Sequence, residues 1–147
     1  MRPALLLALV AAFLLAACDS DDSRSAAKPD PQAREVRDWI EDLNRGDYGD
    51  AAKHFAPNAL VDQGIPFRLK TPKAARLFNA TLPCQAEVVG VEHEGERLLV
   101  SFRLRTGPGG PCQGIVKVRF SFEGTRFSEF LQLPGEGEEP PLPGESV

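Results

Sequence analysis

The strand pattern of this 147-residue chain places two carboxylates, Glu87 and Glu129, on an otherwise apolar face of a sheet. The spacing of two hairpin signals predicts that Glu87 faces Phe102 across one strand pair and that Glu129 faces Val118 across another. Carboxylates on the inner wall of a cavity are suited to acid–base work. Two alternatives stay open: both side chains lie in water near a rim, or the registers slip by one residue.

The strands that carry these carboxylates form the second half of the folded region. Glu94-Gly95 and Glu123-Gly124 are two-residue hairpin signals. Apolar residues alternate with polar ones on both sides of each turn, as a sheet with one buried face requires. The pattern predicts four strands, over about 85–93, 96–106, 114–122 and 125–133.

Three helical segments precede these strands and are the material available to cover their apolar face. Asp30-Pro31 begins the first helix, Trp39 lies on its apolar stripe, and Gly46 ends it. A second, short helix, a brief strand and a third helix are predicted at Tyr48 to Phe55, at Leu60-Val61, and from Thr71-Pro72 onward. The predicted fold is α+β, with three N-terminal helices packed in the concave face of a curved antiparallel sheet.

The chain begins with an uncharged apolar run from Pro3 to Ala17, preceded by Arg2, which indicates a secretory signal peptide. The run is shorter than the roughly 20 residues that a membrane-spanning helix needs. It ends at Leu15-Ala16-Ala17-Cys18, which resembles the lipobox of bacterial lipoproteins. The resemblance implies lipidation of Cys18, cleavage before it, and a lipid-anchored protein on the extracytoplasmic side of a cell membrane. A plain signal peptide with an incidental cysteine is the alternative.

Composition divides the chain into four parts. Residues 1–17 are the predicted signal peptide, and residues 18–32 are the lipidated cysteine with a disordered tether rich in Asp, Ser and Ala. Residues 33–134 form the folded domain, and residues 135–147 are a disordered acidic tail rich in Pro and Gly. The formal net charge of −4 gives no support for nucleic-acid binding.

Lipidation of Cys18 leaves one pair of cysteines, Cys84 and Cys112. An even pair in an oxidising compartment favours a disulfide. Their strands are two strand spacings apart, about 9–10 Å, which is too far for a direct bridge. The Gly107-Pro-Gly-Gly-Pro111 loop provides the freedom for Cys112 to fold toward Cys84. Two free buried thiols are the alternative. The cysteines and histidines lack metal-ligand spacing, so no metal or other cofactor is predicted.

Two segments carry a family resemblance: Trp39-Ile-Glu-Asp-Leu-Asn-Arg-Gly-Asp-Tyr48 and Phe55-Ala-Pro-Asn-Ala-Leu-Val-Asp62. They resemble the opening of nuclear transport factor 2-like domains, which include SnoaL-like polyketide cyclases and ketosteroid isomerases. The resemblance extends over about Arg34 to Leu133 and implies a cystatin-like cone. It says little about function, because this fold carries enzymes, binding modules and structural parts.

The isomerase chemistry of that family needs a carboxylate base and an oxyanion hole made by a Tyr and a protonated Asp. Aligned without gaps, these three positions fall on Trp39, Gln63 and Val118, and none can fill its role. The resemblance therefore implies a pocket that binds a small apolar ligand or a partner protein without catalysis. Its lining is predicted as Trp39, Gln63, Phe102 and Val118, with Glu87 and Glu129 near the wall.

Two further possibilities stay open. A cyclase- or isomerase-like enzyme that uses Glu87 or Glu129 is the alternative function. A second copy of the chain is a further candidate partner, in a homodimer.

The anchor is tested by Cys18→Ser, which removes the thiol that would be lipidated. We expect this variant to lose acyl labelling and to partition into the aqueous phase of a detergent extraction, because it lacks the acyl chains that would hold the protein in the detergent phase. Membrane retention equal to that of the wild type would contradict the lipoprotein interpretation.

Overall fold

The computed structural model describes residues 28–135. Three helices and six strands follow one another as α1 (Pro31–Arg45), α2 (Tyr48–Lys53), β1 (Phe55–Asp62), β2 (Pro66–Leu69), α3 (Pro72–Thr81), β3 (Gln85–Glu94), β4 (Arg97–Arg105), β5 (Ile115–Glu123) and β6 (Arg126–Gln132). The predicted signal peptide, the lipidated Cys18 and the acidic tail from residue 136 onward lie outside the described residues. No helix within residues 28–135 has the length and hydropathy of a membrane span.

The α1 helix begins and ends where the sequence predicts. The Asp30 side chain accepts a hydrogen bond from the backbone N–H of Gln32 at 3.0 Å, and Pro31 occupies the first helical position. Gly46 ends the helix in the left-handed conformation, at φ 77°. Because Pro31 and Gln32 are helical, these two residues of the predicted tether belong to the folded domain.

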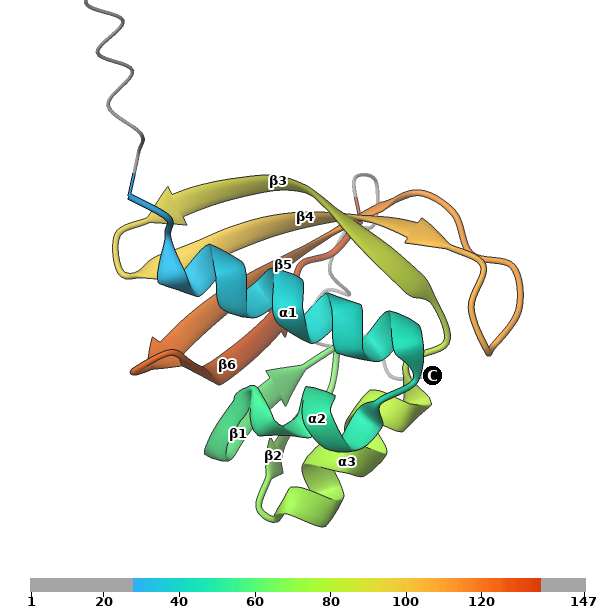
Figure 1. Cartoon of the computed structure of the whole chain (residues 1–147), viewed down its shortest axis with the longest axis horizontal. Coiled ribbons are helices and arrows are strands. Elements are labelled where there is room, and N and C mark those ends of the chain that lie inside the picture. The colour runs from blue at the N-terminus through green and yellow to red at the C-terminus, as the bar shows by residue number, and fades with distance from the viewer. Residues whose placement is uncertain (1–27, 136–147) are drawn as a thin grey trace, which may run out of the picture.

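The sheet is curved and mixed rather than antiparallel, with strand order β2-β1-β6-β5-β4-β3, and α1 lies across its inner face (Figure 1). β1 runs parallel to β6. These segments are far apart in the sequence, and no turn signal predicts their pairing. The four-residue β2 was not predicted, because it begins with a proline and lacks an alternating pattern. The predicted second helix also ends earlier, at Lys53, because Pro57 disfavours helical backbone before it and Phe55 starts β1.

The predicted Cys84–Cys112 disulfide is present, with the two Cα atoms 5.8 Å apart. The glycine loop makes this possible by packing closely against the segment before β3. A Cβ on Gly107 would come within 2.5 Å of the Gln85 nitrogen, and one on Gly109 within 2.4 Å of the Pro83 side chain. Only glycine allows such close approach.

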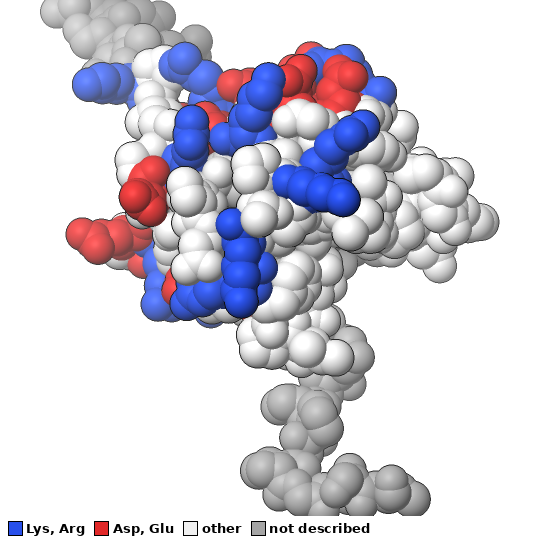
Figure 2. Space-filling model, turned by 90° about the horizontal axis from the view of Figure 1, so that it is seen from below, with Lys and Arg blue, Asp and Glu red and all other residues white. Residues whose placement is uncertain are grey.

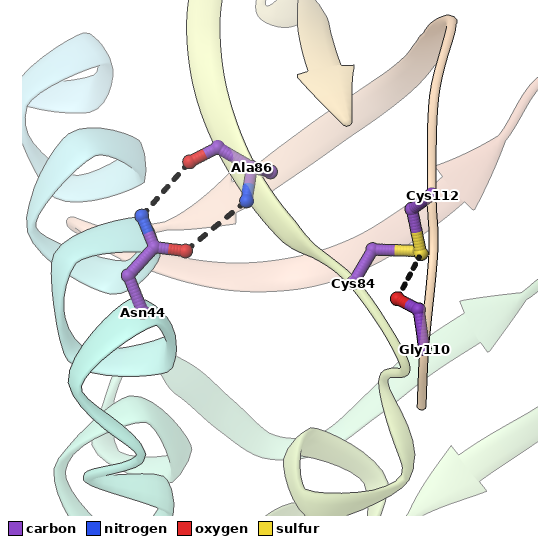
Figure 3. Close-up of a disulfide and its surroundings, with 5 residues drawn as sticks. All are labelled: Asn44, Cys84, Ala86, Gly110 and Cys112. Atoms are coloured by element: carbon purple, nitrogen blue, oxygen red, sulfur yellow. Dashed lines mark hydrogen bonds between the residues drawn. A yellow bond between two sulfur atoms is a disulfide. The ribbon is translucent and has the colours of Figure 1, made fainter. Parts of the chain in front are cut away.

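A second contact fixes the start of β3, an outer strand of the sheet, to the end of α1 (Figure 3). The Asn44 side chain donates to the carbonyl of Ala86 at 2.8 Å and accepts from the Ala86 N–H at 3.1 Å. The amide thus pairs with the strand edge as another strand would. Asn44 and Gly46 belong to the segment from Trp39 to Tyr48 that carries the family resemblance. This segment therefore has a structural role here: Asn44 pairs with β3 and Gly46 ends α1.

We expect Cys84→Ala/Cys112→Ala to lower the free energy of unfolding by about 3–4 kcal/mol in urea denaturation, because the bridge closes a loop between residues 28 positions apart. Cys18→Ser is the matched control and should leave the free energy of unfolding unchanged. Alkylation of two thiols in unfolded, non-reduced Cys18→Ser protein would show that the bridge is absent.

Candidate functional site

The inside of the cone, where the sequence predicted a pocket, is filled by aromatic side chains. Trp39 is 3% exposed and lies edge-on to five phenylalanine rings, at centroid distances of 5.7–6.2 Å. These rings come from four strands: Phe55, Phe102, Phe120, Phe127 and Phe130. Such edge-to-face contacts stabilise a core beyond the burial of area. Trp39, Phe102 and Val118 therefore share one place as predicted, but they share it as parts of one packed hydrophobic core.

The polar atom of the indole is also satisfied inside the core. Trp39 Nε1 donates to Asn79 Oδ1 at 2.8 Å, and Asn79 Nδ2 donates in turn to the carbonyl of Ala75 at 2.7 Å. Asn79 is fully buried and belongs to α3. The hydrogen bonds Trp39–Asn79–Ala75 thus join α1 to α3. The indole N–H has only one hydrogen to donate, so it cannot also donate to a ligand.

The prediction that Glu87 faces Phe102 is wrong. Glu87 pairs with Arg103 across β3 and β4, and its carboxylate lies 3.6 Å from the Arg103 guanidinium with about half of its side chain exposed. The turn between β3 and β4 lies at Gly95-Glu96, one residue later than predicted. With regular pairing from this turn, Glu87 would still lie on the inner face. An extra residue, Val89, interrupts the pairing as a β-bulge and moves Glu87 to the outer face.

The prediction that Glu129 faces Val118 is wrong for the same reason. Glu129 pairs with Ser121, and the Ser121 hydroxyl donates to its carboxylate at 2.7 Å. A β-bulge at Ser128 lies between the hairpin turn and this pair, and it moves the Glu129 side chain to the outer face of the sheet. The two carboxylates on which an acid–base mechanism depended therefore lie outside the cone.

Gln63 also lies away from Trp39. It is exposed at the end of β1, and its side chain donates to the Gln132 side chain at 3.0 Å. The predicted position depended on an ungapped alignment, which places a residue along the strand but does not fix where the strand ends.

His54 lies between two carboxylates at the end of α2. Its Nδ1 lies 2.7 Å from Glu35 and its Nε2 lies 2.9 Å from Asp42, both on α1. The ring also stacks on Phe127. With both nitrogens engaged, His54 holds α1 to the start of β1. Within residues 28–135, no group of three or more His, Cys, Asp or Glu side chains is arranged to hold a metal ion.

A hollow of about 560 Å³ opens between α2, the start of β1, the end of β2 and the start of α3. We call it the α2–α3 hollow. Its walls are mostly apolar, from Ala52, Phe55, Ala56, Leu69 and Ala75. Its size lies within the range of about 300–1,000 Å³ that small-molecule sites occupy.

The charged residues that line the α2–α3 hollow are all basic: Lys53, Lys70, Lys73, Arg76 and Arg126. Lys53 is paired with Asp50, and this hydrogen bond raises the pKa of Lys53 and lowers the pKa of Asp50. The ion pairs found among residues 28–135 engage none of the other four cations. An apolar body with a negatively charged group is the ligand that this arrangement accommodates.

Sequence reasoning missed this hollow, because its walls come from five elements that only the fold brings together. One signal was available. Between Gln63 and Ala86 the chain contains four Lys or Arg residues and no Asp or Glu, although the whole chain is acidic.

No protein-family model and no curated protein matches this chain. Solved structures do match. A cystatin-fold protein from Novosphingobium aromaticivorans is 18% identical, with a TM-score of 0.58 over 70% of this chain and 97% of its own. A polyketide cyclase-like protein from Sinorhizobium meliloti is 19% identical, with a TM-score of 0.57 over 75% and 99% of the two chains. A ketosteroid isomerase-like protein from Kribbella flavida is 18% identical, with a TM-score of 0.57 over 76% and 82%.

These likenesses confirm the cystatin-like α+β part of the predicted fold, whereas the wholly antiparallel sheet was wrong. Residues 28–135 have the fold of cystatin-fold and nuclear transport factor 2-like proteins, with three helices and a curved six-stranded mixed sheet. At this level of identity the likeness concerns the fold, and function has to be argued from the site itself.

The buried Trp39–Asn79 hydrogen bond is tested by Asn79→Ala. We expect this variant to lower the free energy of unfolding by about 1–3 kcal/mol, since it leaves the indole N–H buried without an acceptor. In a Trp39→Phe background, which has no such N–H, the same substitution should cost less, as measured by urea denaturation of all four proteins. Equal costs in both backgrounds would contradict the coupling.

Proposed function

We propose that this chain is an extracytoplasmic lipoprotein, anchored to a cell membrane through Cys18, whose domain binds a small apolar ligand without catalysis. The observation that supports this most is the contrast between a closed interior and an open exterior hollow. Trp39 and five phenylalanines occupy the place of an internal pocket, whereas the α2–α3 hollow offers apolar walls to a ligand from outside.

The positions of the carboxylates favour binding over catalysis. Glu87 and Glu129 lie on the outer face of the sheet, each engaged by a neighbouring side chain. No carboxylate or histidine lines the α2–α3 hollow, so it lacks a proton acceptor of the kind that general base catalysis uses. Its lysines and arginines are suited to hold a negative group rather than to abstract a proton.

The ligand site is tested with 1-anilinonaphthalene-8-sulfonate, an apolar aromatic anion whose fluorescence rises on burial. We expect saturable binding by the wild type. Ala52→Phe should weaken it at least about tenfold, because the added ring occupies the hollow in place of the probe. Native mass spectrometry of the purified protein would then search for a natural apolar ligand.

Ala80→Phe is the matched control, since Ala80 is exposed on α3 and does not line the hollow. It should bind the probe as the wild type does. The near-ultraviolet circular dichroism of Trp39, the only tryptophan, reports whether each variant keeps its packed core. Equal binding by folded Ala52→Phe and Ala80→Phe would refute the assignment of the hollow.

A further inference from the structure

Charge is unevenly distributed along this acidic chain. Residues 63–86 carry Arg68, Lys70, Lys73 and Arg76 and no acidic residue, so this segment has a formal charge of +4. Because the whole chain has a formal net charge of −4, the remainder carries −8. The basic segment comprises β2, α3 and the turns beside them. One side of the domain is therefore cationic, although its overall charge is negative.

The same side exposes large apolar side chains. Ile65 is 80% exposed, Phe67 43% and Leu77 63%. They are three of the five exposed large apolar residues within residues 28–135, and all three belong to β2, α3 or the turn before β2. We call the surface formed by these three residues with Lys70, Lys73 and Arg76 the β2–α3 face; the Arg68 side chain, which donates to the Asn58 carbonyl, is not part of it. Exposed apolar side chains among basic ones on neighbouring elements are typical of an interaction surface.

The figures show this arrangement in space. β2 and α3 lie at the lower end of the domain in Figure 1. In Figure 2, which looks onto that end, lysines and arginines are spread over an otherwise uncharged surface and the acidic side chains gather toward its margins. The α2–α3 hollow is lined by Lys70, Lys73 and Arg76 and thus opens beside this face.

We propose that the β2–α3 face docks on the surface of a membrane that contains anionic phospholipid. Lysines and arginines attract the lipid headgroups, while Ile65, Phe67 and Leu77 enter the boundary between headgroups and acyl chains. Docking of this kind places the α2–α3 hollow against the bilayer, where apolar ligands are concentrated.

A membrane fits this surface better than a protein strand does. β2 is an edge strand, which in principle offers its backbone to another chain. However, it has only four residues, begins with Pro66, and carries Arg68, with Lys70 directly after it. Proline and basic residues are the features by which proteins protect an edge against strand addition. Binding of a membrane through separate basic and apolar side chains needs no such backbone pairing.

The test uses the chain from residue 18 onward with Cys18→Ser, so that the outcome is independent of the lipid anchor. The helices and strands of residues 28–135, their core and the disulfide lie within this shortened chain. Co-sedimentation is measured with phosphatidylcholine vesicles, with and without phosphatidylglycerol, at physiological ionic strength. We expect binding only when phosphatidylglycerol is present, and a steep loss of binding as salt is added.

Lys70→Gln/Lys73→Gln/Arg76→Gln should weaken binding about 100-fold, since each basic residue near an anionic bilayer contributes about fivefold. The matched control, Arg97→Gln/Arg103→Gln/Lys117→Gln, removes the same charge from exposed positions on β4 and β5. Its binding should change by less than about threefold, because these positions are screened from the bilayer. Ile65→Ser/Leu77→Ser should also weaken binding, by about tenfold.

Three results would overturn the proposal: equal binding to vesicles without phosphatidylglycerol, equal losses in the two triple variants, or no binding to anionic vesicles. The last result would assign the β2–α3 face to an acidic protein partner instead. None of these measurements depends on the probe used for the α2–α3 hollow, and the Ala52→Phe variant keeps every residue of the β2–α3 face. Failure of ligand binding and failure of membrane docking are therefore distinguishable.

Discussion

Trp39 stands at the centre of the domain, where its indole ring contacts phenylalanines from β1, β4, β5 and β6 at once. The ring thereby joins α1 to both halves of the sheet. Its N–H reaches Asn79 and so joins α3 to the same core. Since a large aromatic side chain with a satisfied polar atom can be fully buried, the cone closes around it. The absence of an internal pocket at this position is a consequence of that packing.

In this packed domain, the segment that carries the family resemblance has a structural role. In this chain, Asn44 pairs with the backbone at the start of β3 and Gly46 ends α1. The disulfide from Cys84 holds the same part of β3 to the glycine loop. These groups hold the start of an outer strand in place, so their role in this chain is structural.

The open hollow therefore lies on the outside of the cone. The α2–α3 hollow uses the lower end of the domain, where two short helices and β2 leave apolar surface uncovered. Three of the five basic residues around it, Lys70, Lys73 and Arg76, belong to a segment without acidic residues, so this segment is positively charged although the chain is acidic. A fold whose interior is used for packing can in this way carry a site on its surface.

The sequence by itself determined the features that depend on local chemistry. The limits of α1 follow from Asp30, Pro31 and Gly46, and the strands β3 to β6 follow from alternation and two glycine turns. The cysteine pairing followed from counting and from the glycine loop between the strands. The burial of Trp39 followed from helical periodicity.

Only the tertiary structure decided which face each strand residue takes and which distant segments meet. One extra residue, Val89 or Ser128, reverses the face of every residue beyond it, and a bulge leaves no pattern in the sequence that would reveal it. Glu87 and Glu129 thus point outward. The parallel pairing of β1 with β6, the position of His54 between two α1 carboxylates, and the α2–α3 hollow depend on contacts between residues far apart in the chain, which local periodicity does not encode.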